Sequence, residues 1–269
     1  MLPQSKPIRP IKPRPRSLLL NLIGSRGNVK MNAANAVRVG ALFGISENNV
    51  RVTLTRLVSS HLLKIVERGD YQLGEKGQQL AKQVNAWREA ESSLCDWQGD
   101  WVVATTNGLG KTNRSALRIR QRALHMMGMQ QLIHDLYVRP SNFAQGTDFV
   151  RTKLLDLGLE PTAPVFRASD FASDLQQKAK TLWDVNAVET CYRQGLQELE
   201  DSLERLPTLA LDEAAKESYL VGDNALQQLV FDPLLPAPLA DVALRQQFRN
   251  KVREYDEVGE RIWFRFLAQ

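Results

Sequence analysis

Residues 46–73, SENNVRVTLTRLVSSHLLKIVERGDYQL, decide how the N-terminal third of the chain folds. Ser46 belongs to the residue types that cap helix N-termini, and Glu47 follows in the first turn, where the helix dipole favours a carboxylate. The apolar side chains that recur at helical spacing along one face are Val50, Leu54, Leu57 and Val58. These signals predict a helix that buries one face and turns a polar face to solvent.

The second half of the same stretch predicts a hairpin. The segments LLKIV, residues 62–66, and YQL, residues 71–73, have strand character. They are separated by ERGD, a turn sequence in which Gly69 is available for a positive φ. A hairpin that directly follows a helix with a polar outer face is typical of the wing of a DNA-binding domain.

Helical patterns flank this stretch on both sides. Leu18, Leu19, Leu22 and Ile23 form the apolar face of a first helix, which Gly24 and Gly27 end. Residues 33–45, AANAVRVGALFGI, predict a second helix stopped by Gly44, and residues 74–87 a closing helix. The order helix, helix, helix, strand, strand, helix is that of a winged helix-turn-helix, which we place at residues 17–95.

The outer face of the third helix carries side chains that hydrogen-bond bases and phosphates. The candidates for base edges or neighbouring phosphates are Asn48, Asn49, Arg51, Thr55 and Arg56. The candidates for backbone phosphates are Arg16, Lys30, Lys64 and Arg68. The alternative interpretation is a small helical subdomain whose polar face is merely solvated.

Charge is distributed unevenly along the chain. Residues 1–86 hold 14 basic and 4 acidic side chains, a net charge of +10, whereas residues 87–269 hold 21 basic and 26 acidic ones, a net charge of −5. Residues 1–16 contain five prolines and five basic residues without one acid, which predicts a flexible arm that either contacts DNA or solubilises the chain. The basic third predicts a polyanionic partner, but charge alone does not distinguish DNA, RNA and an anionic membrane surface.

The rest of the chain predicts two further domains, so that the fold class is α+β multidomain. Residues 96–172 show the order strand, helix, strand, strand, helix, strand of a ferredoxin-like domain. Residues 173–269 are helical in period throughout, with prolines confined to the connection DPLLPAP. No run approaches the ~18 to 20 apolar residues of a membrane span, and no signal peptide is visible, so we expect a cytoplasmic protein without a membrane partner.

Catalytic and metal-binding patterns are weak. The loop TTNGLGKTNRS resembles a phosphate-binding loop but has Thr105 where the Walker pattern needs a glycine, which favours a capped turn. The cysteines and histidines stand alone in the sequence, without the spacing of metal ligands; they are Cys95, Cys191, His61, His125 and His134. Asp100 alone makes a poor nuclease metal site. We therefore expect no enzyme, no metal and no cofactor.

Several segments resemble one family, the PaaX-type repressors of phenylacetate degradation, and the likeness covers nearly all of the chain from about Ser17 onward. The segments that carry it are NNVRVTLTRLVSSHLL, RGDYQLGEKG, WQGDW, LWDVNAVETCYRQG and FDPLLPAPLA. The segments LWDVNAVETCYRQG and FDPLLPAPLA are fairly specific to this family, whereas NNVRVTLTRLVSSHLL would suit many winged helices. The proline-rich basic arm departs from the family pattern.

The resemblance implies the same three domains, the middle one being similar to the small CRISPR spacer-acquisition subunit. It also implies a homodimeric repressor of a catabolic operon that binds a palindromic double-stranded operator. An acyl-coenzyme A thioester, phenylacetyl-coenzyme A in the namesake group, would release the DNA. The resemblance places no effector-binding residues in this sequence.

Two other functions stay open from the sequence. One is a metal-dependent nuclease that uses the middle domain for cleavage and the winged helix for docking. The other is an adaptor that binds DNA constitutively and recruits a protein through its acidic helical region. The sequence indicates neither the operator nor the target genes, and it leaves open whether activation accompanies repression.

Overall fold

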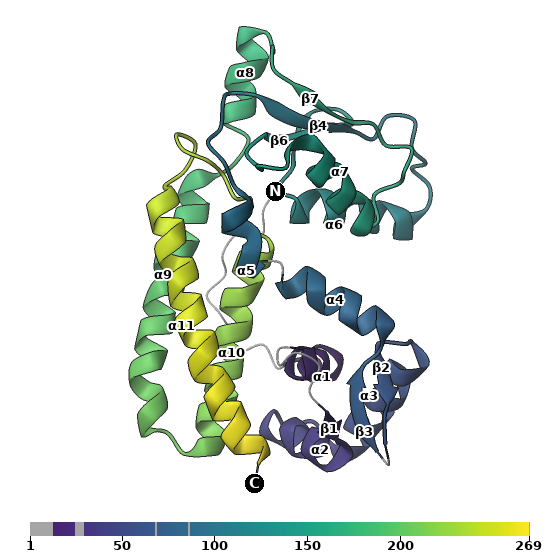
Figure 1. Cartoon of the computed structure of the whole chain (residues 1–269), viewed down its shortest axis with the longest axis vertical. Coiled ribbons are helices and arrows are strands. Elements are labelled where there is room, and N and C mark those ends of the chain that lie inside the picture. The colour runs from purple at the N-terminus through teal and green to yellow at the C-terminus, as the bar shows by residue number, and fades with distance from the viewer. Residues whose placement is uncertain (1–12, 25–29, 68, 86, 269) are drawn as a thin grey trace. The chain divides into compact units, whose positions relative to one another are not determined.

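A computed structural model describes residues 13–24, 30–67, 69–85 and 87–268. It combines helices with two small antiparallel sheets, and its last third is helical (Figure 1). The chain divides into two compact units. The first consists of Met1–Arg88, Gln197–Leu226 and Lys251–Gln269, and the second of Glu89–Leu196 and Gln227–Asn250. The α+β class with a helical C-terminal region is confirmed.

Three helices begin the first unit: α1 (Pro15–Gly24), α2 (Ala33–Leu42) and α3 (Glu47–Ser59). Gly44 adopts a φ of +63° directly after α2, so the predicted glycine stop is confirmed. A Cβ atom on Gly40 would lie 2.5 Å from Cγ2 of Val50, which means that α2 and α3 cross closely at this glycine. The turn between the two helices is therefore short and tightly fixed.

A three-stranded sheet lies beside these helices. Its strands are β1 (Met31–Asn32), β2 (Leu63–Ile65) and β3 (Asp70–Leu73), in the order β1-β3-β2 with antiparallel pairing. Gly69 has a φ of +92° in the β2–β3 turn, as its position in ERGD predicts. The two-residue strand β1 has no sequence signature, because it exists only through its pairing with β3. α4 (Glu75–Asn85) and α5 (Trp87–Ala90) follow the sheet.

The core of the first unit includes side chains from the end of the chain. The leucines of α1 and the apolar faces of α2 and α3 pack with Tyr219, Trp263 and Phe266. These three aromatic residues come from α10 (Leu211–Val230) and α11 (Val242–Leu267). Phe43 and Tyr219 meet edge to face with ring centroids 5.3 Å apart, a favourable geometry for aromatic pairs. The N-terminal helices thus share one core with the C-terminal ones.

The second unit is built on a four-stranded antiparallel sheet. Its elements in chain order are β4 (Trp101–Thr105), α6 (Arg114–Met126), β5 (Gln130–Ile133), β6 (Leu136–Pro140), α7 (Gly146–Asp156) and β7 (Val165–Ala168). The strand order is β5-β6-β4-β7. Every strand and helix that the sequence predicts between residues 96 and 172 is present within a few residues of its expected position.

Both faces of this sheet are covered. Val102, Leu124 and Leu154 belong to the cluster that α6 and α7 form on one face. Trp101 and Val103, which alternate with Val102 along β4, belong to a cluster on the other face with α8 (Ser173–Lys180). The ring of Trp101 stacks on that of Trp183 with centroids 6.1 Å apart. Burial on both faces explains why β4 reads as a continuous apolar run.

The helices of the last third are α8, α9 (Val185–Arg205), α10 and α11, with a short 3₁₀ turn at Leu206–Thr208 between α9 and α10. Another 3₁₀ turn, Glu91–Ser93, follows α5 earlier in the chain. The sequence predicts all four long segments as helices. The compact units group these residues differently from the three sequence domains, because α9, α10 and α11 each contribute residues to both units. The division at residues 17–95, 96–172 and 173–269 therefore stays a prediction.

Two glycine substitutions in the first unit test the packing. A Cβ atom on Gly77 of α4 would lie 2.1 Å from the backbone oxygen of Leu62, whereas one on Gly222 of α10 would lie 3.5 Å from Tyr255, an ordinary contact. We expect Gly77→Ala to lower the free energy of unfolding by about 1–3 kcal/mol. Gly222→Ala should raise it by up to about 1 kcal/mol, since alanine is the better helix former. Thermal unfolding followed by circular dichroism should show opposite shifts; shifts in the same direction would contradict this packing.

Candidate nucleic-acid interface

The helix α3 is fixed in place by its cap and its buried face. The Oγ of Ser46 accepts a hydrogen bond from the Asn49 amide at 3.4 Å, as the sequence predicts for a cap. Val50, Leu54 and Leu57 are each at most 3% exposed and pack in the core of the first unit. With one face locked in this way, the opposite face of the helix is presented rigidly to solvent.

All five α3 residues predicted as DNA contacts lie on the side of the helix away from the core. They are Asn48, Asn49, Arg51, Thr55 and Arg56. Val52 lies on the same side and is 39% exposed, although a β-branched apolar residue gains nothing from facing water. Val52 therefore adds an apolar group to the otherwise polar outer face of α3. Val52 was not among the predicted site residues. The sequence feature that could have identified it is its position among the polar residues of the outer face of α3.

The two arginines of α3 differ in their surroundings. Arg51 pairs with Glu47 one turn earlier, with Nη2 2.7 Å and Nε 2.8 Å from Oε1. Arg56 forms no ion pair with any residue that the structure describes, and it lies in the last turn of the helix. Arg56 therefore has no ion pair to give up before it contacts a partner, whereas Arg51 would have to leave Glu47 first.

The phosphate candidates are placed on several elements. Lys64 is exposed on β2, and Lys30 is exposed at the start of β1, with its Nζ 3.7 Å from Oε2 of Glu67. Lys64 is thus part of β2, whereas Lys30 directly precedes β1, and β3 lies between these two strands. The three-stranded sheet β1-β3-β2 is called the wing sheet below, after the element that the sequence predicts. Arg16 is exposed on α1. Arg68, like residues 1–12 of the arm, lies outside the described residues.

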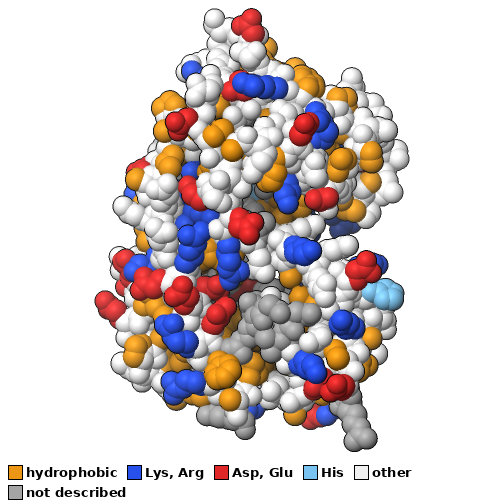
Figure 2. All heavy atoms as spheres, viewed as in Figure 1, with side chains coloured by type: hydrophobic (Ala, Val, Ile, Leu, Met, Phe, Trp, Pro, Cys, Tyr) orange, Lys and Arg blue, Asp and Glu red, His pale blue; other side chains and the backbone are white. Residues whose placement is uncertain are grey.

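Basic and acidic side chains are interspersed over the face of the molecule shown in Figure 2. The lysine and arginine side chains of the described residues thus do not form one continuous patch on this face. A net charge such as that of residues 1–86 gives only long-range attraction, so it does not by itself define a binding site on this face.

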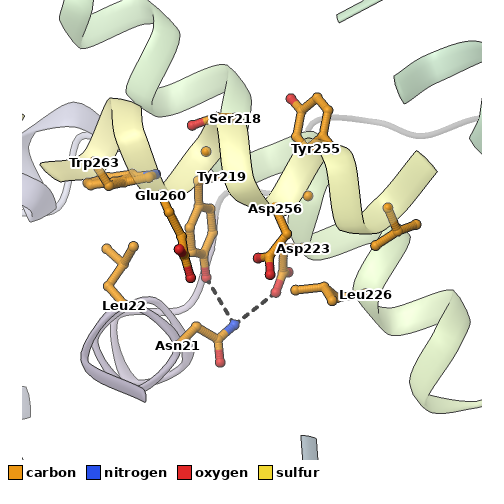
Figure 3. Close-up of a pocket in the computed structure, with 13 residues that line it drawn as sticks. Asn21, Leu22, Ser218, Tyr219, Asp223, Leu226, Tyr255, Asp256, Glu260 and Trp263 are labelled. Atoms are coloured by element: carbon orange, nitrogen blue, oxygen red, sulfur yellow. Dashed lines mark hydrogen bonds between the residues drawn. The ribbon is translucent and has the colours of Figure 1, made fainter. Parts of the chain in front are cut away.

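A small pocket lies between α1, α10 and α11 (Figure 3). Its volume is about 90 Å³, and Asn21 of α1 enters it, donating from Nδ2 to Oδ1 of Asp223 at 2.8 Å and to the hydroxyl of Tyr219 at 3.4 Å. Asp223, Asp256 and Glu260 are acidic members of its lining, which includes no lysine or arginine among the described residues. Burial raises the pKa of Tyr219, so its hydroxyl stays protonated. The sequence could not reveal this pocket, since its walls lie about 200 residues apart in the chain.

A larger pocket of about 720 Å³ lies beside the first, and the two share Leu22 and Glu260. Its basic lining residues are Lys30, Arg261 and Arg265. The apolar ones include Ile23, Met31, Phe264 and Leu267, and Phe264 is 68% exposed. This combination of a basic rim and an apolar wall suits an anionic ligand that also has an apolar part.

The residues of the weak catalytic motifs are engaged in contacts within the fold. In the loop before α6, Oδ1 of Asn113 accepts from the amides of Ser115 and Ala116, which confirms a capped turn, and Lys111 Nζ lies 2.7 Å from Oδ2 of Asp135. Asp100 is buried and pairs with Arg167. Over the described ranges, no group of three or more His, Cys, Asp or Glu side chains is arranged to hold a metal ion. Cys95 and Cys191 are free thiols.

The helices of the described segments include none long and apolar enough to cross a membrane. No family model matches the chain, and no curated protein matches it. Among solved structures, the chain is similar to the uncharacterized protein Rv0674 from Mycobacterium tuberculosis, with 21% sequence identity and a TM-score of 0.54. The likeness covers 91% of this chain and 97% of the other. It shows a shared fold over almost the whole length.

The cap of α3 is testable on its own. Ser46→Ala removes the acceptor of the Asn49 amide and should destabilise the first turn by about 1 kcal/mol, whereas Ser46→Asp keeps an acceptor and adds a favourable charge. Hydrogen exchange of peptides covering residues 46–51 should be faster in the alanine variant and unchanged or slower in the aspartate variant. Equal exchange in the two variants would show that the cap does not hold the helix.

Proposed function

We propose that this chain is a DNA-binding transcriptional regulator, most simply a repressor, whose N-terminal segment is a winged helix-turn-helix. The observation that carries the proposal is α3, which buries one face completely and exposes Asn48, Arg56 and their neighbours on the other. The close α2–α3 crossing and the wing sheet that follows also support it. A rigid helix with amide, hydroxyl and guanidinium groups outward fits the major groove.

In this proposal α3 enters the major groove and the wing sheet contacts the backbone. Arg56 and the asparagines read base edges, and Val52 contacts a thymine methyl group. Lys30 and Lys64 neutralise phosphates on either side and thereby set the register of the helix. Specificity then rests on few contacts, because each good base contact contributes about 1–3 kcal/mol of discrimination.

The remainder of the chain would hold two copies together on a palindromic operator. The strand order β5-β6-β4-β7, with two helices on one face, supports a ferredoxin-like middle domain. Only the family resemblance supports a role of the helical region in dimerisation. A cytoplasmic homodimer that covers a promoter is the mechanism we propose, with a catabolic operon as its target.

Selection of DNA by the full chain tests this function and does not require the operator sequence to be known. A random duplex pool enriched by the wild-type protein should yield a palindromic consensus. Arg56→Ala should bind that consensus roughly 5- to 150-fold more weakly, since one base contact is lost. Arg193→Ala, an exposed arginine of α9, is the control and should bind normally. Absence of enrichment, or wild-type affinity in Arg56→Ala, refutes the proposal.

We further propose that an acyl-coenzyme A thioester, phenylacetyl-coenzyme A in the simplest case, controls DNA binding. The larger pocket supports this, because its volume lies within the range of about 300–1,000 Å³ for small-molecule sites and three basic residues line it. Lys30 lines this pocket and is also a phosphate candidate. An anionic effector that takes up Lys30 would remove a DNA contact. The small acidic pocket is a poor fit for the thioester in both size and charge.

Ligand-dependent stabilisation of the full chain tests the effector. Phenylacetyl-coenzyme A should raise the melting temperature, by an amount that corresponds to about 2.7 kcal/mol at one hundred times its Kd, and should weaken DNA binding. Coenzyme A is the control for the nucleotide part. The double variant Arg261→Gln/Arg265→Gln should lose the shift while keeping its fold. If no acyl-coenzyme A changes either quantity, the constitutive DNA-binding adaptor becomes the better description.

A metal-dependent nuclease is less favoured. The one ligand that the sequence offered for it, Asp100, is buried and already engaged by the guanidinium group of Arg167. A carboxylate held in this way serves the packing of the strand end. Cleavage of duplex DNA that depends on Asp100 would be required to revive that function.

A further inference from the structure

The helix α6 carries a row of three arginines that no function so far assigned uses. Arg114, Arg118 and Arg122 follow one another at four-residue intervals and all three are exposed. None of them forms an ion pair or a hydrogen bond with any residue in the part of the chain that the structure describes. We call these three residues the α6 arginine row.

The fourth arginine of the helix shows the contrast. Arg120 points to the opposite side, is 5% exposed and is bound by the carboxylate of Glu160 and by the backbone oxygen of Gly110 at 3.0 Å. The Glu160 contact raises the pKa of Arg120 and lowers that of Glu160. The helix thus has one arginine with a structural role and three that project into solvent.

The row is unfavourable for the helix itself. Like charges four residues apart destabilise a helix by roughly 0.2–0.5 kcal/mol per pair, and the row contains two such pairs. Arg114 also lies in the first turn, where the helix dipole disfavours a cation. Two exposed arginines of other helices have an acid one turn away, in the pairs Arg51–Glu47 and Arg193–Glu189. α6 contains no acidic residue at all.

The shape of the row indicates an extended polyanion. Successive arginines rise about 6 Å along the helix, so the row spans about 12 Å in a nearly straight line. A compact anion would reach only one or two of these groups. Duplex DNA carries one charge per about 1.7 Å of its axis, so a backbone lying along α6 offers a phosphate to each arginine. Gln121 and His125 share this side of the helix and add further polar groups.

We propose that the α6 arginine row binds the phosphate backbone of duplex DNA, as a second, sequence-independent contact besides α3. The inference rests on the proposed DNA-binding function. The row lies in the otherwise acidic part of the chain, residues 87–269, where a local cationic stripe defines a docking position for a backbone. If the row binds DNA, the second unit contacts DNA directly.

Four forms of the full chain test this: wild type, Arg114→Gln/Arg118→Gln/Arg122→Gln, Arg51→Gln/Arg56→Gln, and the two sets combined. Their affinities for a 60-base-pair duplex of random sequence are measured by fluorescence anisotropy over a range of salt concentrations. A matched control, Lys178→Gln/Lys180→Gln/Lys216→Gln, removes three exposed positive charges elsewhere. Circular dichroism verifies that each form is folded; the row variant should melt no lower than wild type, because repulsion is relieved.

We expect the row variant to bind at least tenfold more weakly at low salt, with a slope of log affinity against log salt shallower by about 2 to 3, since each phosphate contact contributes about 0.9. The lysine control should lose less than threefold. Duplex DNA should also slow hydrogen exchange in α6. A row variant that behaves like the lysine control refutes the inference, as does equal binding of wild type to polyglutamate, which would indicate an acidic protein partner.

This experiment distinguishes a wrong α6 contact from a wrong assignment of α3 as the reading helix. If the α3 variant loses binding and the row variant does not, the α6 contact is wrong and the reading helix stands. If the row variant loses binding and the α3 variant binds both the random duplex and the enriched consensus like wild type, the row stands and the reading helix is wrong. Additive losses in the combined variant support two independent contacts.

Discussion

The close crossing of α2 and α3 is the constraint on which the rest of the first unit depends. Gly40 leaves room for Val50 to approach the backbone of α2, and any Cβ atom there would collide with it. This approach lets Val50, Leu54 and Leu57 bury completely, and their burial fixes which side of α3 faces solvent. The orientation of Asn48 and Arg56 is therefore set by apolar packing on the far side of the same helix, before any partner arrives.

Local patterns predicted most elements of this fold. The cap at Ser46, the stop at Gly44 and the turn at Gly69 were predictable because each depends on the conformational preference of a single residue. The apolar run of β4 and the helical periods after residue 173 were readable for the same reason. β1 was missed, since a two-residue strand is created by its partner and not by its own sequence.

The candidate site was predictable only in part. The outer face of α3 follows from periodicity, and its five predicted residues all lie away from the core. The two pockets depend on α10 and α11 returning to α1, a long-range arrangement that no local pattern records. The ion pair that distinguishes Arg120 from the α6 arginine row joins residues 40 positions apart and also depends on the folded chain. The Arg51–Glu47 pair, by contrast, is local to α3, with its residues one helical turn apart.

The shared core of the first unit has a consequence for how such a protein evolves. Tyr219, Trp263 and Phe266 fill the core that α1, α2 and α3 begin, so the first 88 residues cannot be transplanted as a free-standing module without leaving an apolar surface bare. Recombination that exchanges only the N-terminal segment between relatives would be selected against. Under the proposed function, a new DNA target in such a lineage would therefore arise by point substitutions on the outer face of α3 and not by shuffling.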